Sequence, residues 1–183
     1  MIIKQFTAKN GTIFVLRTFE RKDLSRVNEF MNFVNDIVEE DDYIHTNKKQ
    51  TLKETKKDLT DMLKASLKKE SFAVVAEIDQ KIAGFADITS KKFRENHVAV
   101  IGIIIGRTYR GIGLGSQILS ALMAEGNLKL KEKPKIIELE VFETNKNARI
   151  VYQKLGFKKI AELPNRVQRR GNLVFKIMME KYV

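Results

Sequence analysis

The sequence predicts a single α/β domain, and three features of the chain support that prediction. Its 183 residues are enough for one domain with a core of its own. Hydrophobic residues make up 43% and charged residues 31%, a balance typical of globular proteins. Apolar runs of strand length alternate with segments whose apolar residues recur every three or four positions, as in amphipathic helices. No internal repeat or interdomain linker interrupts residues 1–183, so we expect one domain throughout.

The N-terminal part of the chain predicts strands followed by two helices. Residues 11–17 carry apolar side chains on both faces of an extended chain, which is typical of a strand covered on both sides, and residues 2–6 fit an additional edge strand. Asp23 is a plausible N-cap for an amphipathic helix over residues 24–38. The sequence Thr-Leu-Lys-Glu is a capping box that opens a second helix over residues 51–67.

The remaining elements follow in a regular order. Strand patterns at 71–78 and 82–89 are joined by the tight turn Asp79-Gln80-Lys81 and predict a hairpin. Further along we expect a buried strand over 97–105, a helix from about 113, a strand over 136–142, a helix over 145–155 capped by Gly156, a strand over 157–163, a basic turn over 164–172 and a last strand over 173–182.

A glycine-rich turn between a buried strand and a helix is the most informative stretch of the chain. Such a turn brings backbone N–H groups and the positive end of the helix dipole together, which favours an anion such as a phosphate. A P-loop requires a Lys that this turn lacks, and a Rossmann turn requires a Gly where Ser116 stands. The pattern that fits is Arg-x-x-Gly-x-Gly, as Arg110, Gly113 and Gly115. An ordinary flexible loop is the alternative for so short a motif.

A second motif lies about 30 residues further on. A strand ends in Val141, Asn145 and Ala148 follow, and the sequence Tyr-Gln-Lys-Leu-Gly-Phe starts at Tyr152. In this order and spacing the two motifs resemble the acyl-CoA-binding signatures of the GNAT family, the GCN5-related N-acetyltransferases. The resemblance covers roughly residues 82–157 well, and the order of the earlier elements also agrees with the family.

The resemblance implies a particular α/β (α+β) fold and a co-substrate. The fold is a GNAT-type central mixed, mostly antiparallel sheet with helices on both faces and a splayed strand pair, here residues 98–105 and 136–142. Acetyl-CoA would enter that opening, and no metal is implied. The pantetheine would contact the backbone of Ile103, Ile104 and Ile105 together with Asn145, and the diphosphate would contact Arg110, Gly111, Ile112, Gly113, Leu114, Gly115 and Ser116.

The resemblance also implies chemistry, namely direct attack of a primary amine on the thioester through a tetrahedral intermediate. The backbone N–H near Ile103 is the candidate donor to the oxyanion, and Tyr152 is the candidate general acid for the leaving thiolate. Many family members carry a Glu base where this chain has Val100. The base therefore stays open among Glu40, Asp41, Glu77, Asp87, Glu138, Glu140 and His97.

Four acidic residues follow the first predicted helix, where they oppose the helix dipole. Glu40 and Asp41 among them are candidate substrate residues, because a negative mouth would attract a cationic amine. A solvated loop is the alternative interpretation.

Net charge and composition limit the other partners. The net charge is +11, and residues 154–183 hold eight basic and two acidic residues. A basic chain attracts nucleic acid, acidic membranes and polyphosphates alike, but no nucleic-acid motif and no run of membrane-spanning length is found. The chain has no Cys and two His, which disfavours a zinc site and suits the cytoplasm. The apolar strand over 173–182 leaves a homodimer possible.

The resemblance to the GNAT family therefore implies an acyl-CoA-dependent N-acetyltransferase. Its acceptor would be a primary amine of a small metabolite, an amino acid, a polyamine or a protein N-terminus. The alternative is a noncatalytic acyl-CoA-binding or sensing module on the same fold, and Val100 in place of the usual Glu is the feature in its favour.

Overall fold

The computed structural model describes residues 1–8, 10–40 and 43–183. Over these ranges eight strands form one sheet in the order β1-β2-β3-β4-β5-β6-β8-β7. The strands are β1 (Ile2–Thr7), β2 (Ile13–Thr18), β3 (Ser71–Ile78), β4 (Lys81–Ser90), β5 (Val98–Ile105), β6 (Ile136–Phe142), β7 (Lys158–Arg169) and β8 (Asn172–Tyr182). The helices are α1 (Val27–Glu39), α2 (Leu52–Leu67), α3 (Leu114–Lys129) and α4 (Lys146–Lys154), with short 3₁₀ turns η1 (Arg21–Arg26), η2 (Phe93–Glu95) and η3 (Arg107–Tyr109).

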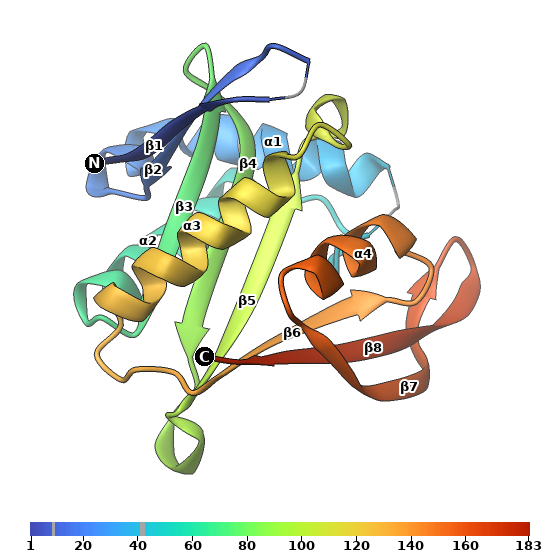
Figure 1. Ribbon diagram of the computed structural model, residues 1–183. Coiled ribbons are helices and arrows are strands. Elements are labelled where there is room, and N and C mark those ends of the chain that lie inside the picture. Colours follow the sequence, from blue (N-terminus) through green and yellow to red (C-terminus); the bar gives the residue numbers. More distant parts are fainter. Residues whose placement is uncertain (9, 41–42) are drawn as a thin grey trace.

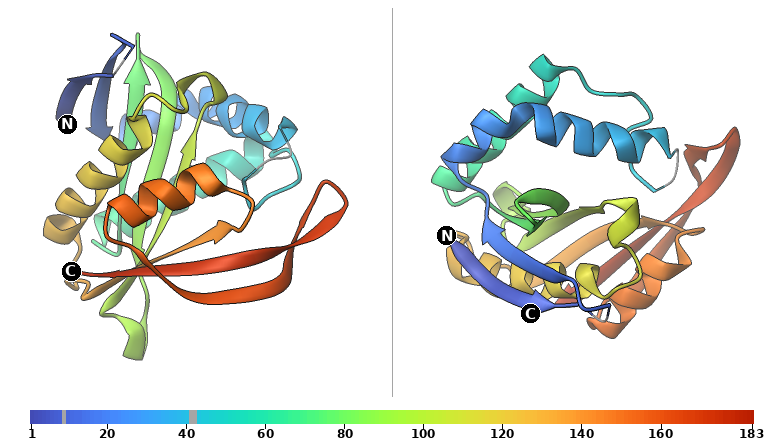
Figure 2. Two further views of the ribbon diagram at one scale, coloured as in Figure 1. Left: turned by 45° about the vertical axis from the view of Figure 1, so that its right-hand side comes forward. Right: turned by 90° about the horizontal axis from the view of Figure 1, so that it is seen from above.

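Helices cover both faces of the sheet, as Figures 1 and 2 show, with α1 and α2 on one face and α3 and α4 on the other. The side chains of the central strand β3 explain why both faces of the sheet are covered. Phe72, Val74 and Ala76 belong to the core cluster under α3, whereas Ala73 and Val75 belong to the cluster under α1 and α2. A strand buried on both faces needs apolar residues at successive positions, which explains the continuous apolar run. The predicted mixed, mostly antiparallel sheet with helices on both faces is confirmed.

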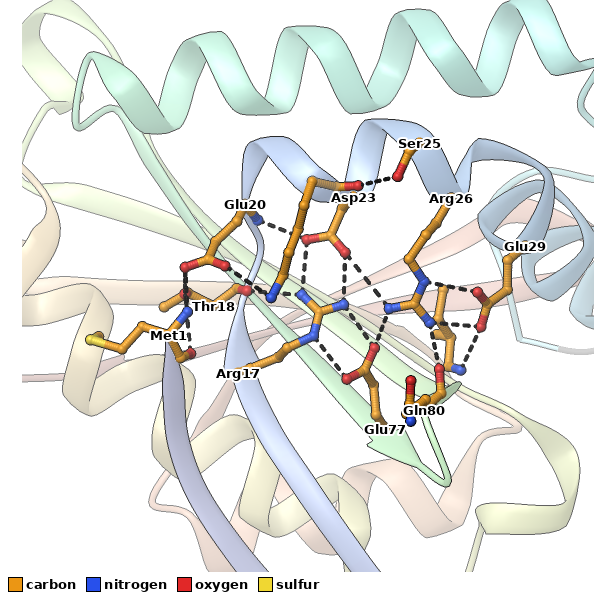
Figure 3. A network of polar contacts seen from close by, with 12 residues as sticks. Met1, Arg17, Thr18, Glu20, Asp23, Ser25, Arg26, Glu29, Glu77 and Gln80 are labelled. Atoms are coloured by element: carbon orange, nitrogen blue, oxygen red, sulfur yellow. Dashed lines mark hydrogen bonds and ion pairs between the residues drawn. The ribbon is translucent and has the colours of Figure 1, made fainter.

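A network of buried charges fixes the start of α1 to the sheet (Figure 3). Asp23 is fully buried, and its carboxylate accepts hydrogen bonds from the Arg17 guanidinium at 2.7 and 2.9 Å. It also accepts a bond from the backbone N–H of Glu20 at 2.8 Å. Arg17 donates in turn to Glu77 on β3 at 2.8 and 2.9 Å. The prediction that Asp23 is the N-cap of α1 was wrong. Asp23 lies within η1, and its carboxylate binds the guanidinium of Arg17 on β2.

The C-terminal hairpin corrects a second prediction. The expected basic turn over residues 164–172 is mostly strand, since β7 continues to Arg169 and pairs with β8. Pro164 is tolerated because β7 is an edge strand, and the register shifts between Leu163 and Val167. The turn itself is centred on Gly171, whose φ is +77°.

The last strand is not at an edge of the sheet. β8 lies between β6 and β7 and pairs with both, so it offers no free edge to a second copy of the chain. Ile177 and Met179 of this strand are buried in the core, whereas Leu173 and Tyr182 are 62% and 71% exposed. The homodimer was expected to form through a free edge of this strand, and β8 has none. None of the described helices is long and apolar enough to span a membrane.

Candidate functional site

The sheet opens between its two parallel strands. β5 pairs with β4 from Ala99 to Ile105, but with β6 only at residues 98–100. Figure 1 shows β5 and β6 diverging beyond that point. The backbone N–H of Gly106 bonds to Ala83 at 3.0 Å, on the β4 side. Because backbone groups alternate along a strand, those of Ile105 and Ile103 are directed into the opening.

The glycine-rich turn lies at the end of β5, next to this opening. Gly111 and Gly113 have φ values of +78° and +94°, which favour glycine, and α3 begins at Leu114 without a side-chain cap. An added Cβ at Gly111 or Gly113 would meet no atom within 4 Å, so the turn faces open space. Uncapped N–H groups and that space together suit a diphosphate, so the residues present fit the CoA moiety that the sequence implies.

Arg110 connects the turn to the opposite helix layer. Its Nη1 lies 2.6 Å from Oε2 of Glu40, which follows α1, and its Nε donates to the carbonyl oxygen of Ile105 at 3.0 Å. Glu40 therefore lies beside the predicted diphosphate site. Asp41, the other acid predicted to contact substrate, falls outside the described residues.

Helix α4 brings the second motif to the same face as α3. Asn145 is its N-cap, and Oδ1 accepts the N–H of Ala148 at 3.2 Å, so the side-chain NH₂ is the group left for a ligand. Tyr152 is 8% exposed and packs edge-on against Phe157, with ring centroids 6.1 Å apart. Burial raises the pKa of Tyr152 to about 12, so the phenol stays protonated at neutral pH.

A cavity of about 240 Å³ lies on the other face of the sheet, between α1, α2, β4 and β5. Aromatic and aliphatic side chains dominate its lining, with four polar ones. The lining residues are Phe30, Phe33, Val34, Gln50, Thr55, Asp58, Leu59, Met62, Phe85, Asp87, Gly102, Ile103 and Ile104. The cavity thus reaches β5 at Gly102 and Ile103, where the strand has already parted from β6.

Asp87 is a carboxylate in the wall of this cavity. It pairs across the sheet with Gly102, and its Oδ1 would lie 3.0 Å from a Cβ added there, so the carboxylate rests against the β5 backbone. Thr89 donates a hydrogen bond to Oδ2 at 3.2 Å. Burial raises the pKa of Asp87 to about 6, and the Thr89 bond only partly opposes that shift.

The other described candidates for a base have different surroundings. Glu77 is bound by Arg17, and Glu138 by Lys91 at 2.7 Å. Glu140 is bound by Lys176 at 2.7 Å. His97 is exposed at the start of β5, away from the opening. Sequence reasoning named Asp87 without preferring it, although it is the one charged residue in the apolar run 82–89.

The fold and the candidate site together define the class of this protein. It is an α/β protein with a splayed pair of parallel strands and a glycine-rich turn at a helix N-terminus. The family model described as "Acetyltransferase (GNAT) family" matches residues 33–157. The chain belongs to this family. No curated protein matches the chain in sequence.

Solved structures with the same fold include several acetyltransferases. One is an acetyltransferase of the GNAT family from Streptococcus pneumoniae (TM-score 0.78, 23% identity, 93% of this chain and 99% of that chain). A second is yncA, a putative acetyltransferase from Salmonella typhimurium with its cofactor acetyl-CoA (TM-score 0.78, 17% identity, 92% and 93%). A third is RimL, a ribosomal L7/L12 α-N-protein acetyltransferase in complex with coenzyme A (TM-score 0.81, 16% identity, 100% and 98%). At these identities the likeness establishes a shared fold.

Proposed function

We propose that this chain is an acetyl-CoA-dependent N-acetyltransferase that acts on a primary amine. Membership of the GNAT family supports the reaction class. Two structures with the same fold contain acetyl-CoA or coenzyme A, which supports the co-substrate. The observation that carries the proposal is the opening between β5 and β6 beside an uncapped, glycine-rich helix start. The absence of cysteines suits the cytoplasm, which we propose as the compartment.

The contacts proposed for the CoA moiety use groups at the opening in the sheet and at the glycine-rich turn. The backbone groups of Ile103 and Ile105 are directed into the opening, where they can pair with the pantetheine amides as a neighbouring strand would. The side-chain NH₂ of Asn145 is positioned to add a further bond. The first N–H groups of α3 and the guanidinium of Arg110 would hold the diphosphate.

Two groups of the chain would act on the reaction centre. When bound, acetyl-CoA supplies the thioester carbonyl that the amine attacks. The backbone N–H of Ile103 would donate to the oxygen on which negative charge develops. The hydroxyl of Tyr152, a residue that is 8% exposed, would protonate the leaving thiolate. Its pKa of about 12 exceeds that of a thiol, about 8.5, so this transfer must be concerted with cleavage of the C–S bond.

A binding measurement combined with a transfer assay tests this function. Calorimetric titration with acetyl-CoA should show a single site, and mass spectrometry should detect a gain of one acetyl group on at least one amine of a diverse panel. Binding of CoA with no transfer to any amine would favour a noncatalytic acyl-CoA-binding or sensing module instead. No binding at all would contradict both functions.

A further inference from the structure

The cavity between α1, α2 and the sheet lies next to the proposed reaction centre. Gly102 and Ile103 belong to its lining, and Ile103 is also the proposed oxyanion donor. The last residue pair that joins β5 to β6 is Val100 with Glu138, and Val100 lies two residues before Gly102. A group inside the cavity therefore has access to the opening in the sheet from the face opposite α3 and α4.

Asp87 differs from the other described candidate bases in its charge environment. Glu40, Glu77, Glu138 and Glu140 each have an Arg or Lys partner. Asp87 accepts a hydrogen bond from the neutral hydroxyl of Thr89, and no Lys or Arg is among the described residues that line its cavity. A partly buried carboxylate without a cationic partner is costly, and a cationic ligand would offset that cost.

The other residues that line the cavity restrict the size and the polarity of the group attached to the ammonium. Phe30, Phe33 and Met62 present apolar surface, and the volume of about 240 Å³ is below the ~300 Å³ at which drug-sized sites begin. A carboxylate inside this cavity would lie beside Asp58 and Asp87 and would have no cationic partner among the described lining residues. A second ammonium would have to compete for Asp58, which is exposed and already accepts a hydrogen bond from Nε2 of Gln50 at 2.9 Å. Burying a charge without a partner is unfavourable.

We propose that this cavity binds the acceptor, a primary amine on a compact apolar group, and that Asp87 binds its ammonium and accepts its proton. The inference rests on the proposed acetyltransferase function and identifies the class of amine for it. Asp87 would act from β4, next to the strand on which many members of the family carry Glu.

The proposed acetyl transfer conserves protons and electrons at each step. One ammonium N–H bond breaks, its electron pair stays on nitrogen, and the proton goes to an oxygen of Asp87. The nitrogen lone pair then forms the C–N bond at the thioester carbonyl, and the C–S bond breaks with its electrons on sulfur. The thiolate takes the proton of Tyr152, and the phenolate recovers one from the nitrogen, so the reaction releases a single proton, from Asp87 to solvent.

The pH dependence follows from the groups that face Asp87. Ala73 of β3, Gly102 of β5 and Phe33 of α1 are neutral, and Asp58 of α2 is the other titratable side chain among the described lining residues. The pKa of Asp87, about 6, leaves it ionised at neutral pH and able to accept a proton.

Three experiments test the proposal, the first with an amine panel. Benzylamine and isobutylamine should be acetylated with kcat/KM at least ~10-fold above that of putrescine, glycine and a Ser-Ala peptide. Val34→Phe should fill part of the cavity, raise the KM of benzylamine ~10-fold or more and leave acetyl-CoA affinity unchanged. A preference for putrescine, glycine or the peptide, unaffected by Val34→Phe, would overturn the apolar-amine assignment.

The second experiment concerns the base. Asp87→Asn should lower kcat/KM at pH 7 by ~100-fold or more. The rate of this variant should keep rising with pH toward the pKa of the free amine, near ~10, whereas the wild-type rate should stay constant over that range. Asp36→Asn, an exposed carboxylate on α1, is the matched control and should keep the wild-type profile. An Asp87→Asn enzyme with the wild-type rate and profile would overturn the role of Asp87 while leaving the acetyltransferase function intact.

The third readout does not depend on turnover. With the protein saturated with coenzyme A, calorimetry should detect benzylamine binding that weakens ~10-fold or more in Asp87→Asn and in Val34→Phe. Equal binding by both variants and the wild type would overturn the cavity as the acceptor site. Failure of the proposed function would look different, because no amine of any class would then be acetylated.

Discussion

Arg110 and Glu40 are 70 residues apart in sequence, yet Nη1 of Arg110 lies 2.6 Å from Oε2 of Glu40. The pair ties the glycine-rich turn to the end of α1. Glu40 would therefore compete for the guanidinium with the diphosphate that we propose binds here. The Arg110 side chain is 36% exposed and that of Glu40 is 14% exposed, and an ion pair near the surface is typically worth about 1 kcal/mol or less.

Glu40→Gln should therefore strengthen acetyl-CoA binding by roughly twofold to fivefold, because Arg110 loses a carboxylate partner that would compete with the diphosphate. Calorimetry at a fixed ionic strength measures the change. Glu39→Gln, which removes the neighbouring acid paired with Lys49, is the control for general electrostatics. Unchanged or weaker binding in Glu40→Gln would mean that Arg110 does not hold the diphosphate.

Removing the hydroxyl of Tyr152 should affect the chemical step and not binding. In Tyr152→Phe we expect kcat to fall ~100-fold, because the thiolate loses its proton donor, with acetyl-CoA affinity within about twofold of wild type. Steady-state kinetics and calorimetry on the same preparation separate the two effects. If kcat stays at the wild-type value, the proposed acid is some other group.

Asp87 should make the fold less stable as the pH rises. Its folded-state pKa of about 6 exceeds the ordinary value of 3.8, so the folded protein binds more protons between these pH values and unfolding becomes easier as pH increases through them. Asp87→Asn should thus be more stable than wild type at pH 7.5, by about 1 to 3 kcal/mol, and equally stable near pH 3.5. Urea unfolding at both pH values measures this. A variant that is less stable at pH 7.5 would mean that the ionised carboxylate stabilises the fold.

The buried pair of Asp23 and Arg17 should dominate the stability of the region that positions α1. Asp23→Ala removes two charge-assisted hydrogen bonds from Arg17, a residue that is 4% exposed, and leaves Glu77 as its other carboxylate partner. We therefore expect a loss of about 3 kcal/mol or more in the free energy of unfolding. Asp36→Ala, on the exposed side of α1, should change it by about 0.5 kcal/mol or less. Similar losses in the two variants would show that the network contributes little.

Elements set by local patterns were predicted well from sequence. The strand over Ile136–Phe142 has the expected bounds, and Gly156 takes the left-handed conformation expected of a helix C-cap, with φ +91°. Asp79 and Gln80 both have positive φ, as a tight hairpin turn with a right-handed twist requires. In each case the responsible residues lie within a few positions of the feature, so tertiary contacts did not override them.

Predictions failed where distant residues decide the outcome. Asp23 fits a capping rule locally, but Arg17 on β2 and Glu77 on β3 draw it into a buried network. Pro164 and its basic neighbours resemble a turn, but pairing with β8 extends the strand to Arg169. The partner strands were predicted from sequence, but the residues with which they pair depend on the folded structure.

Some residues of the candidate site could be predicted from local sequence, and others could not. The turn residues Arg110 to Ser116 carry a motif, so sequence identified them. Asp87 belongs to no sequence motif. Its proposed role as the base depends on its pairing with Gly102 and on which other carboxylates have cationic partners. Those facts depend on sheet register and require the three-dimensional structure.

Hydrogen exchange with and without acetyl-CoA tests the central claim most directly, since the claim is that the co-substrate pairs with the free edge of β5 and lies on the start of α3. Saturation with acetyl-CoA should slow amide exchange ~10-fold or more at residues 103–105 and 111–116. Exchange that is unchanged in both segments of the saturated protein would contradict the account.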